Sequence, residues 1–153
     1  MRIWVAADHG AWDLKEELVV WIRERHAVEV VDLGVHSGEA VDYPDLADEV
    51  CRHLVAGGSM DRGILLCGTG LGMSIAANRW AGVRAGLCHD EYTARMARQH
   101  NDANVLVMGG RVTGVAVARA IVDVWLQESF EGGRHQRRLD KLEYYARTRD
   151  VPH

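Results

Sequence analysis

The chain contains no long uninterrupted apolar run: across its 153 residues the hydrophobic stretches are short and separated by charges. A membrane-spanning helix needs about 20 consecutive apolar residues, so the sequence predicts that the protein does not enter a membrane. The N-terminal stretch MRIWVAADHG also lacks the apolar core and cleavage site of a signal peptide. We therefore expect a cytoplasmic protein.

Cysteine is scarce, and its pattern excludes two kinds of site. The three cysteines are an odd number and have no CxxC spacing, which disfavours both disulfides and a zinc cage. No spacing of His, Asp or Glu suggests another metal site. Basic residues are not in excess either: the formal net charge is −4, so nucleic acid is not an expected partner.

Apolar residues make up 48% of the chain, enough for a buried core, and they occur as alternating strand and helix patterns. Strands are predicted over 2–7, 28–34, 63–67, 83–88 and 104–109. Helices are predicted over 13–26, 43–58, 71–80, 91–100, 114–128 and 134–148. This alternation is typical of a parallel sheet covered on both faces. We predict an α/β fold: a single Rossmann-like three-layer α/β/α domain over residues 1–153, with a five-stranded parallel sheet.

In such folds ligands bind at the carboxyl ends of the strands. Four of the five predicted strands end in polar or glycine-rich clusters. These clusters are Asp8-His9, Cys67-Gly68, Cys88-His89-Asp90 and Gly109-Gly110-Arg111. The sequence therefore predicts a binding site along this edge of the sheet.

The stretch CGTGLG, residues 67–72, is a glycine-rich turn between a predicted strand and a predicted helix. Backbone N–H groups in such a turn, together with the helix dipole, favour an anion. A dinucleotide fingerprint is one interpretation, with Asp90 as the ribose-binding acid. It is a weak match, because the spacing is GxGxG and the turn follows the third strand.

Cys67 has two interpretations. A thiolate at this turn could act as a general base, and the neighbouring N–H groups could stabilise an oxyanion, which suits proton abstraction next to a carbonyl. Alternatively, Cys67 is a small buried residue at a strand end, as many free cysteines are. Cys51 lies on the apolar stripe of a helix and Cys88 ends an apolar strand, so both are expected in the core.

Two histidines and two arginines stand out near these elements. His9 follows Asp8 at a strand end, and His100 ends a helix; each suits proton transfer, or is an exposed polar residue or a cap. Arg134 and Arg138 are four residues apart, so they share a helix face and suit a phosphate. A solvated basic helix and a nucleic-acid-binding arm are the alternatives.

Together these signals resemble the type B ribose-5-phosphate isomerases and their galactose-6-phosphate isomerase relatives over nearly the whole chain. The matching stretches are ADHGAWDLK, DYPDLA, GILLCGTGLGMSIAANR, RAGLCHDEYTARMARQHNDANVLVMGGRV and EGGRHQRRLDKL. The resemblance implies an aldose–ketose isomerase that needs no metal or cofactor. It also implies a homodimer, in some cases paired into a tetramer, with sites shared between subunits and the C-terminal helix packed on the partner.

The implied reaction interconverts D-ribose 5-phosphate and D-ribulose 5-phosphate. The alternatives are the same chemistry on another aldose (a hexose or tetrose phosphate, or a free sugar) and a non-catalytic module that binds a sugar phosphate or nucleotide. By resemblance, Cys67 moves the proton between C2 and C1, Thr69 assists proton transfer at the oxygens, and His100 opens the sugar ring. The implied substrate contacts are Asp8, His9, Gly68, Gly70, Gly72, Asn101, Arg111, Arg134, His135 and Arg138.

In this resemblance Gly68, Gly70 and Gly72 hold the enediolate oxygens, and the arginines bind phosphate, with Arg134 and Arg138 reaching in from the partner. Two positions depart from the family pattern. Some relatives carry a glutamate base where this chain has Leu71, so Cys67 has no substitute here. The first loop reads DHGA rather than the usual DHxG, which places its glycine one position early.

Overall fold

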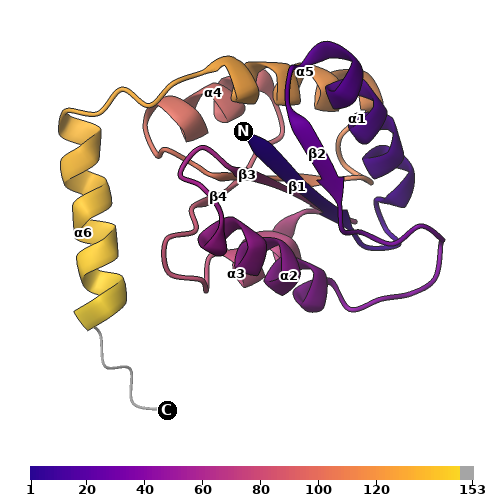
Figure 1. Ribbon diagram of the computed structural model, residues 1–153, viewed down its shortest axis with the longest axis horizontal. Coiled ribbons are helices and arrows are strands. Elements are labelled where there is room, and N and C mark those ends of the chain that lie inside the picture. The colour runs from indigo at the N-terminus through magenta and orange to yellow at the C-terminus, as the bar shows by residue number, and fades with distance from the viewer. Residues whose placement is uncertain (149–153) are drawn as a thin grey trace.

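The predicted strands form one parallel sheet in the order β2-β1-β3-β5-β4 in the computed structural model, which describes residues 1–148 (Figure 1). The strands are β1 (Arg2–Ala7), β2 (Glu29–Asp32), β3 (Arg62–Cys67), β4 (Ala85–Leu87) and β5 (Val105–Gly109). The three central strands are buried along nearly their whole length, because helices cover both faces of the sheet. The predicted α/β fold with a five-stranded parallel sheet is confirmed.

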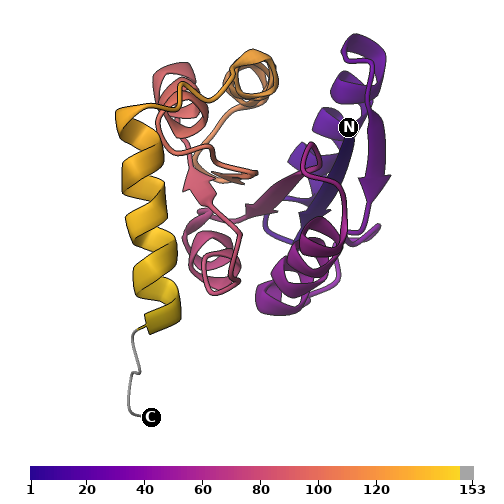
Figure 2. The same cartoon turned by 60° about the vertical axis from the view of Figure 1, so that its left-hand side comes forward.

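Two layers of helices enclose this sheet. One layer contains α1 (Trp12–Arg25), α4 (Glu91–Gln99) and α5 (Val115–Gln127). The opposite layer contains α2 (Tyr43–Ala56) and α3 (Leu71–Ala77). The last helix, α6 (Arg134–Thr148), belongs to neither layer and stands beside the β4 edge (Figures 1 and 2). Within residues 1–148, no helix has both the length and the apolar character needed to cross a bilayer.

Side chains of β3 alternate between the two faces of the sheet and contribute to the hydrophobic core on each face. Ile64 and Leu66 pack toward the α1–α4–α5 layer, whereas Leu65 and Cys67 pack toward the α2–α3 layer. Successive side chains of a strand point to opposite faces, so four consecutive residues serve two cores. Fully burying an aliphatic side chain of this kind stabilises the fold by about 1.5–3 kcal/mol.

Helix α3 and strand β4 are both shorter than predicted. The helix predicted over 71–80 ends at Ala77, and the strand predicted over 83–88 covers only Ala85–Leu87. The side chain of Asn78 explains both ends: its amide donates to Ala85 O and its carbonyl accepts from Ala85 N, each at 3.0 Å. These bonds hold the intervening residues as a turn.

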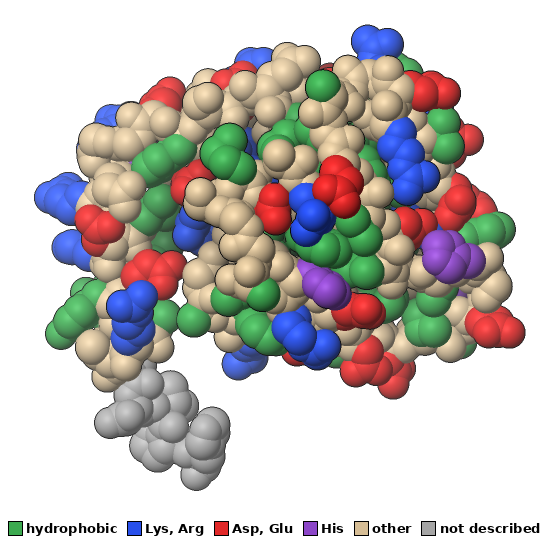
Figure 3. Space-filling view, viewed as in Figure 1, with side chains coloured by type: hydrophobic (Ala, Val, Ile, Leu, Met, Phe, Trp, Pro, Cys, Tyr) green, Lys and Arg blue, Asp and Glu red, His purple; other side chains and the backbone are tan. Residues whose placement is uncertain are grey.

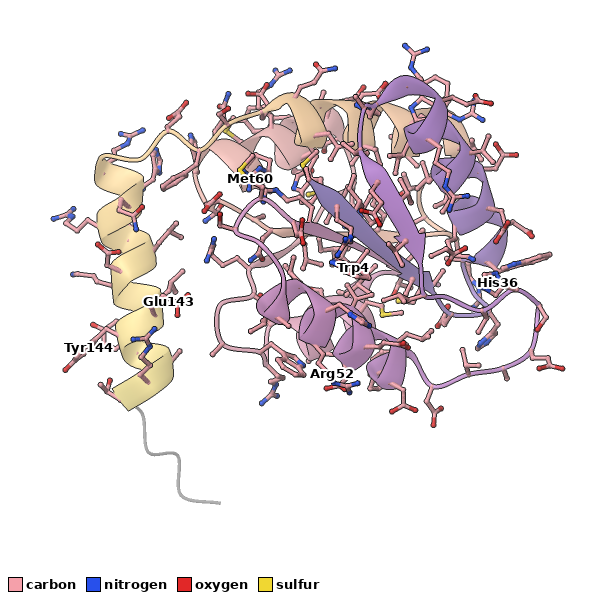
Figure 4. All side chains as sticks on the ribbon, in the orientation of Figure 1. Trp4, His36, Arg52, Met60, Glu143 and Tyr144 are labelled. Atoms are coloured by element: carbon pink, nitrogen blue, oxygen red, sulfur yellow. The ribbon has the colours of Figure 1, made fainter. Side chains whose placement is uncertain are left out.

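Helix α6 contacts the rest of the chain over a narrow strip. Its apolar contact is Leu139, whereas Leu142 and Tyr144 are more than half exposed. Glu143 is directed toward the body of the protein, where it lies 3.8 Å from Arg84, and Tyr144 is directed away (Figure 4). Lysine and arginine side chains gather along the outer side of α6 (Figure 3). The helix thus presents an extensive surface to solvent.

Candidate functional site

The carboxyl ends of β1 and β3 lie side by side at a point where the chain leaves the sheet in opposite directions. Ala7 pairs with Leu66, and Cys67 pairs with Gly109 of β5, so these three strand ends meet at one edge. The helix after β1 packs on one face and the helix after β3 on the other. Open α/β sheets bind ligands in the crevice that such a reversal creates.

The turn after β3 directs a backbone donor at the Cys67 sulfur. The Gly70 N–H donates to Cys67 Sγ at 3.1 Å, and Gly70 adopts a left-handed φ of 81° at the start of α3. A side chain here would be strained, and its Cβ would lie 2.5 Å from Leu87 Cδ1. Cys67 is 5% exposed, and the neighbouring Thr69 is exposed. The turn therefore places a thiol, a hydroxyl and a donor N–H together.

The first loop packs directly against this turn. Asp8 is buried, and its Oδ1 accepts from the Gly10 N–H at 2.8 Å, while His9 is exposed. A Cβ on Gly10 would lie 2.9 Å from the backbone nitrogen of Gly68, too close for a real side chain. The glycine of the DHGA sequence thus lets the two loops approach closely, and the buried Ala11 fits against Gly110.

Arg111 adds positive charge to the same edge. Its N–H donates to Gly68 O at 3.0 Å, and its guanidinium lies about 3.6 Å from the position of a Cβ on Gly68. On the other side of the turn, the Tyr43 ring covers Gly72, where a Cβ would come within 2.7 Å of the ring. Small residues in the turn therefore leave room for a cation on one side and an aromatic ring on the other.

A second group of candidate residues gathers where α4 ends and α6 begins. The rings of His100 and His135 are stacked, with centroids 4.1 Å apart and planes 8° apart. Arg134 Nε donates to His135 Nε2 at 3.3 Å. The His135 side chain is buried, and desolvation lowers its pKa, as do the charges of His100 and Arg134. Arg138, one turn along α6, adds to this effect.

The two groups lie at opposite edges of the sheet: one at the carboxyl ends of the strands, the other at the amino ends. The residues between His100 and β5 pass the amino ends of the strands, where the Gly63 N–H donates to Asn104 O at 2.8 Å. Cys67 lies at the carboxyl ends, and the five residues of β5 alone span about 13 Å. One edge carries Asp8, His9, Cys67, Gly68, Thr69, Gly70, Gly72 and Arg111; the other carries His100, Asn101, Arg134, His135 and Arg138.

The remaining predicted clusters have structural roles. Burial raises the pKa of Cys51 to about 12 and that of Cys88 to about 11, so both stay neutral thiols at pH 7. Their expected place in the core is confirmed. Asp90 caps α4 by accepting from the Thr93 N–H at 2.7 Å. This capping role accounts for Asp90, so the interpretation of Asp90 as a ribose-binding acid is not needed.

Two groups of side chains bring metal-ligating atoms within 4.8 Å of one another, although no sequence spacing suggested them. They are Glu16–Asp32–His36 and His100–Glu131–His135. In the first, the Lys15 ammonium contacts both carboxylates, at 2.8 and 2.6 Å, and supplies the positive charge itself. In the second, Arg134 engages the Nε2 lone pair of His135 that a metal would need. Neither group is assigned to a metal.

Sequence reasoning did not single out Tyr43 or Glu131. Tyr43 opens the DYPDLA stretch, and its position over Gly72 depends on how α2 packs against α3. Glu131 opens the EGGRH stretch, and its Oε2 lies 3.6 Å from His135 Nε2 and 3.9 Å from His100 Nε2. The only signal for either residue was its place in a stretch that matches the family.

Comparison with known proteins agrees with this architecture. A family model described as Ribose/Galactose Isomerase matches residues 3–142. Ribose-5-phosphate isomerase B of Escherichia coli is 50% identical over 92% of this chain and 93% of its own length. D-erythrulose-4-phosphate isomerase of Pectobacterium atrosepticum is 40% identical over 95% of each chain. The structure of Clostridium thermocellum ribose-5-phosphate isomerase B superposes with a TM-score of 0.90 at 47% identity, covering 94% of this chain and 96% of the other. The chain belongs to the ribose/galactose isomerase family.

Proposed function

We propose that the protein is an aldose–ketose isomerase that interconverts D-ribose 5-phosphate and D-ribulose 5-phosphate. The observation that carries this proposal is the Gly70 N–H aimed at the Cys67 sulfur at a strand end, where substrates of this fold bind. A donor in this position stabilises negative charge on sulfur. The names of relatives at 47% and 50% identity support the choice of sugar phosphate.

Ring opening comes first and is the role of His100. The bond between C1 and the ring oxygen breaks, and its electron pair stays on the ring oxygen, which takes a proton from the imidazolium. The anomeric hydroxyl gives up its proton to water, and its oxygen becomes the C1 carbonyl. Imidazole suits this step because it changes protonation near neutral pH.

Isomerisation then moves one proton from C2 to C1. The Cys67 thiolate takes the C2 proton, and the electron pair of that bond forms the C1–C2 double bond while the carbonyl electrons move to O1. The resulting enediolate is stabilised by the N–H groups of the glycine turn. Transfer of the O2 proton to O1, assisted by Thr69, and return of the proton from Cys67 to C1 give the ketose and restore the thiolate.

Both steps require Cys67 and His100 at one sugar, so the proposed active form is a homodimer with shared sites. One chain supplies the Cys67 edge, and its partner supplies the His100 edge with Arg134 and Arg138. Two features support this arrangement: the two edges are separated within one chain, and α6 presents most of its surface to solvent. The phosphate would lie between Arg111 of one chain and the α6 arginines of the other.

A tetrose phosphate is the alternative substrate that a specific observation favours. One relative at 40% identity is named D-erythrulose-4-phosphate isomerase. A non-catalytic sugar-phosphate module is disfavoured, because such a module has no need of Cys67, Thr69 and His100. The shifted glycine of the DHGA loop lies beside the turn that follows Cys67, since Gly10 lies against Gly68.

The test is to incubate the purified protein with ribose 5-phosphate, erythrose 4-phosphate, glucose 6-phosphate and free ribose. Ketose formation is followed by NMR, with the Cys67→Ala variant as control. We expect the highest kcat/KM with ribose 5-phosphate. A higher value with the tetrose phosphate would transfer the assignment to that substrate, and binding without any ketose product would support the non-catalytic module.

A further inference from the structure

Glu131 lies in front of the stacked histidines, in the connection between α5 and α6. Its N–H donates to Gln99 O at 3.0 Å, which ties it to the end of α4 beside His100. Its carboxylate faces the Nε2 atoms of both rings, at 3.6 Å for His135 and 3.9 Å for His100. The chain then turns through Gly132 and Gly133 into α6, which returns His135 to the same place.

The stacking of His100 on His135 limits how many protons the two rings can hold. Two imidazolium rings with centroids 4.1 Å apart repel each other, so the pair holds one proton more readily than two. The hydrogen bond from Arg134 disfavours a proton on His135. The Arg134 Nε–H donates to His135 Nε2, which must therefore be an unprotonated acceptor. Burial also disfavours a charge on His135, and its pKa is lowered.

The remaining candidate for the proton is Nε2 of His100, and the nearest anion to it in this group is Glu131. The other charged groups that act on His135 are Arg134 and Arg138, both cations. Glu131 thus offsets part of the positive charge that disfavours a proton on His135. Its half-exposed side chain contributes little to the core, so its placement is not explained by packing.

We propose that Glu131 is a positioning residue that retains the shared proton of the histidine pair, while Arg134 directs that proton to His100. This inference rests on the proposed ring-opening role of His100, and it adds a residue that acts through another. Arg134 occupies the Nε2 lone pair of His135, and the Glu131 carboxylate faces both rings and opposes the surrounding cations. The pair would then present one acid to the sugar at neutral pH.

The first test is independent of activity. In the full-length protein, the imidazole signals are followed by NMR as pH is varied, and His135 is identified with a His135→Asn variant. Glu131→Gln removes the charge that raises the His135 pKa, so we expect its titration midpoint to fall by roughly half to one pH unit. Glu131→Asp should restore most of this fall.

Glu143→Gln is the matched control, because Glu143 is a partly exposed carboxylate on α6 that faces Arg84 rather than the histidines. It should leave the His135 midpoint unchanged. A midpoint that does not move in Glu131→Gln, or that moves equally in Glu143→Gln, overturns the proposal. Thermal melts of both variants establish that each is folded.

The second test uses the pH dependence of turnover. Without the Glu131 carboxylate, the histidine pair should keep its proton only at lower pH. The alkaline limb of the kcat/KM profile for cyclic ribose 5-phosphate should therefore move to lower pH in Glu131→Gln. We expect a several-fold loss at pH 8, with little change for Glu143→Gln. An unmoved limb in an active enzyme overturns the proposal. If the wild-type chain does not isomerise sugars, the proposed function fails, and the NMR midpoint still decides the role of Glu131.

Discussion

The buried Lys15 and the partly buried Asp32 form an ion pair that ties α1 to the end of β2, with Nζ and Oδ2 2.6 Å apart. Lys15 is 0% exposed, so its charge depends on this partner and on Glu16. Asp32 also accepts from the Gly34 N–H at 3.0 Å, and its two oxygens thereby fix the chain where it leaves β2. The pair thus supports the loop that leads from β2 to α2.

Replacing Lys15 with Met should destabilise the protein strongly. The substitution leaves the partly buried Asp32 carboxylate without its cation, and breaking a fully buried pair in this way costs about 3–5 kcal/mol, which is the upper bound here. Urea unfolding measures the change. Arg52→Met is the control, because Arg52 and Asp48 form an exposed pair on α2, and its loss should cost less than about 1 kcal/mol. Equal losses in the two variants would show that the Lys15 pair adds nothing beyond a surface contact.

Cys67→Ala should reduce kcat for the sugar phosphate by roughly 10²–10⁴-fold, the usual contribution of a general base. Binding of the substrate, measured by calorimetry, should change little, because the base acts in the transition state. Cys51→Ala is the control, since the Cys51 thiol is buried in the α2–α3 core. Near-normal turnover in Cys67→Ala would remove this thiol from the mechanism.

Iodoacetamide should modify Cys67 before the other two cysteines of the folded protein at pH 7. Only thiolates react, and pKa values of about 11 and 12 leave Cys88 and Cys51 with roughly 10⁻⁴ and 10⁻⁵ thiolate at that pH. Raising the pH to 9 increases both fractions about 100-fold, because neither pKa is reached. Peptide mass spectrometry identifies the modified residue. Earlier modification of Cys88 would contradict the structure.

His100→Asn should slow turnover of the cyclic sugar more than turnover of the open-chain aldehyde, because only the cyclic form needs ring opening. Rapid mixing with freshly generated open-chain substrate separates the two rates. We expect a loss of about 10²-fold or more for the cyclic form. Equal losses for both forms would place His100 elsewhere in the reaction.

Mixing two inactive variants tests the shared site. If the site is shared as proposed, Cys67→Ala and the double variant Arg134→Ala/Arg138→Ala should each be inactive alone, whereas a mixed dimer would have one site with both defects and one with neither. Activity should therefore return in proportion to the mixed dimers, which native mass spectrometry counts.

The structure adds a second pairing, Cys67→Ala with His100→Asn, which should recover activity in the same way. Combining His100→Asn with the double arginine variant is the matched control, because those residues lie at one edge and every site stays defective. Verified exchange without recovery in the first two mixtures would falsify the shared-site model.

The central sheet could be predicted because its apolar strands and amphipathic helices are encoded locally. The strand-end rule also places Asp8, Cys67 and Arg111 correctly, since it depends only on the parallel topology. The end of α3 was missed because it depends on Asn78 reaching the backbone of Ala85, seven residues away. Short-range periodicity does not contain such a contact.

The grouping of His100 with the α6 arginines required the structure. The resemblance implied that Arg134 and Arg138 come from the partner subunit, but it did not state which edge carries His100. His100 and His135 are 35 positions apart, and their stacking depends on the connection through Glu131. No periodic pattern relates those elements, because α6 does not pack on the sheet.

The hydrogen bonds between Asn78 and Ala85 also limit how copies of this protein can meet. Strand β4 is an outer strand of the sheet, and at Ala85 both outward-facing backbone groups are already satisfied by the Asn78 side chain. A foreign strand would have to displace that amide before it could pair there. Joining two sheets into one continuous sheet is therefore blocked at this residue, which favours association through helices and leaves β4 protected from fibril-like stacking.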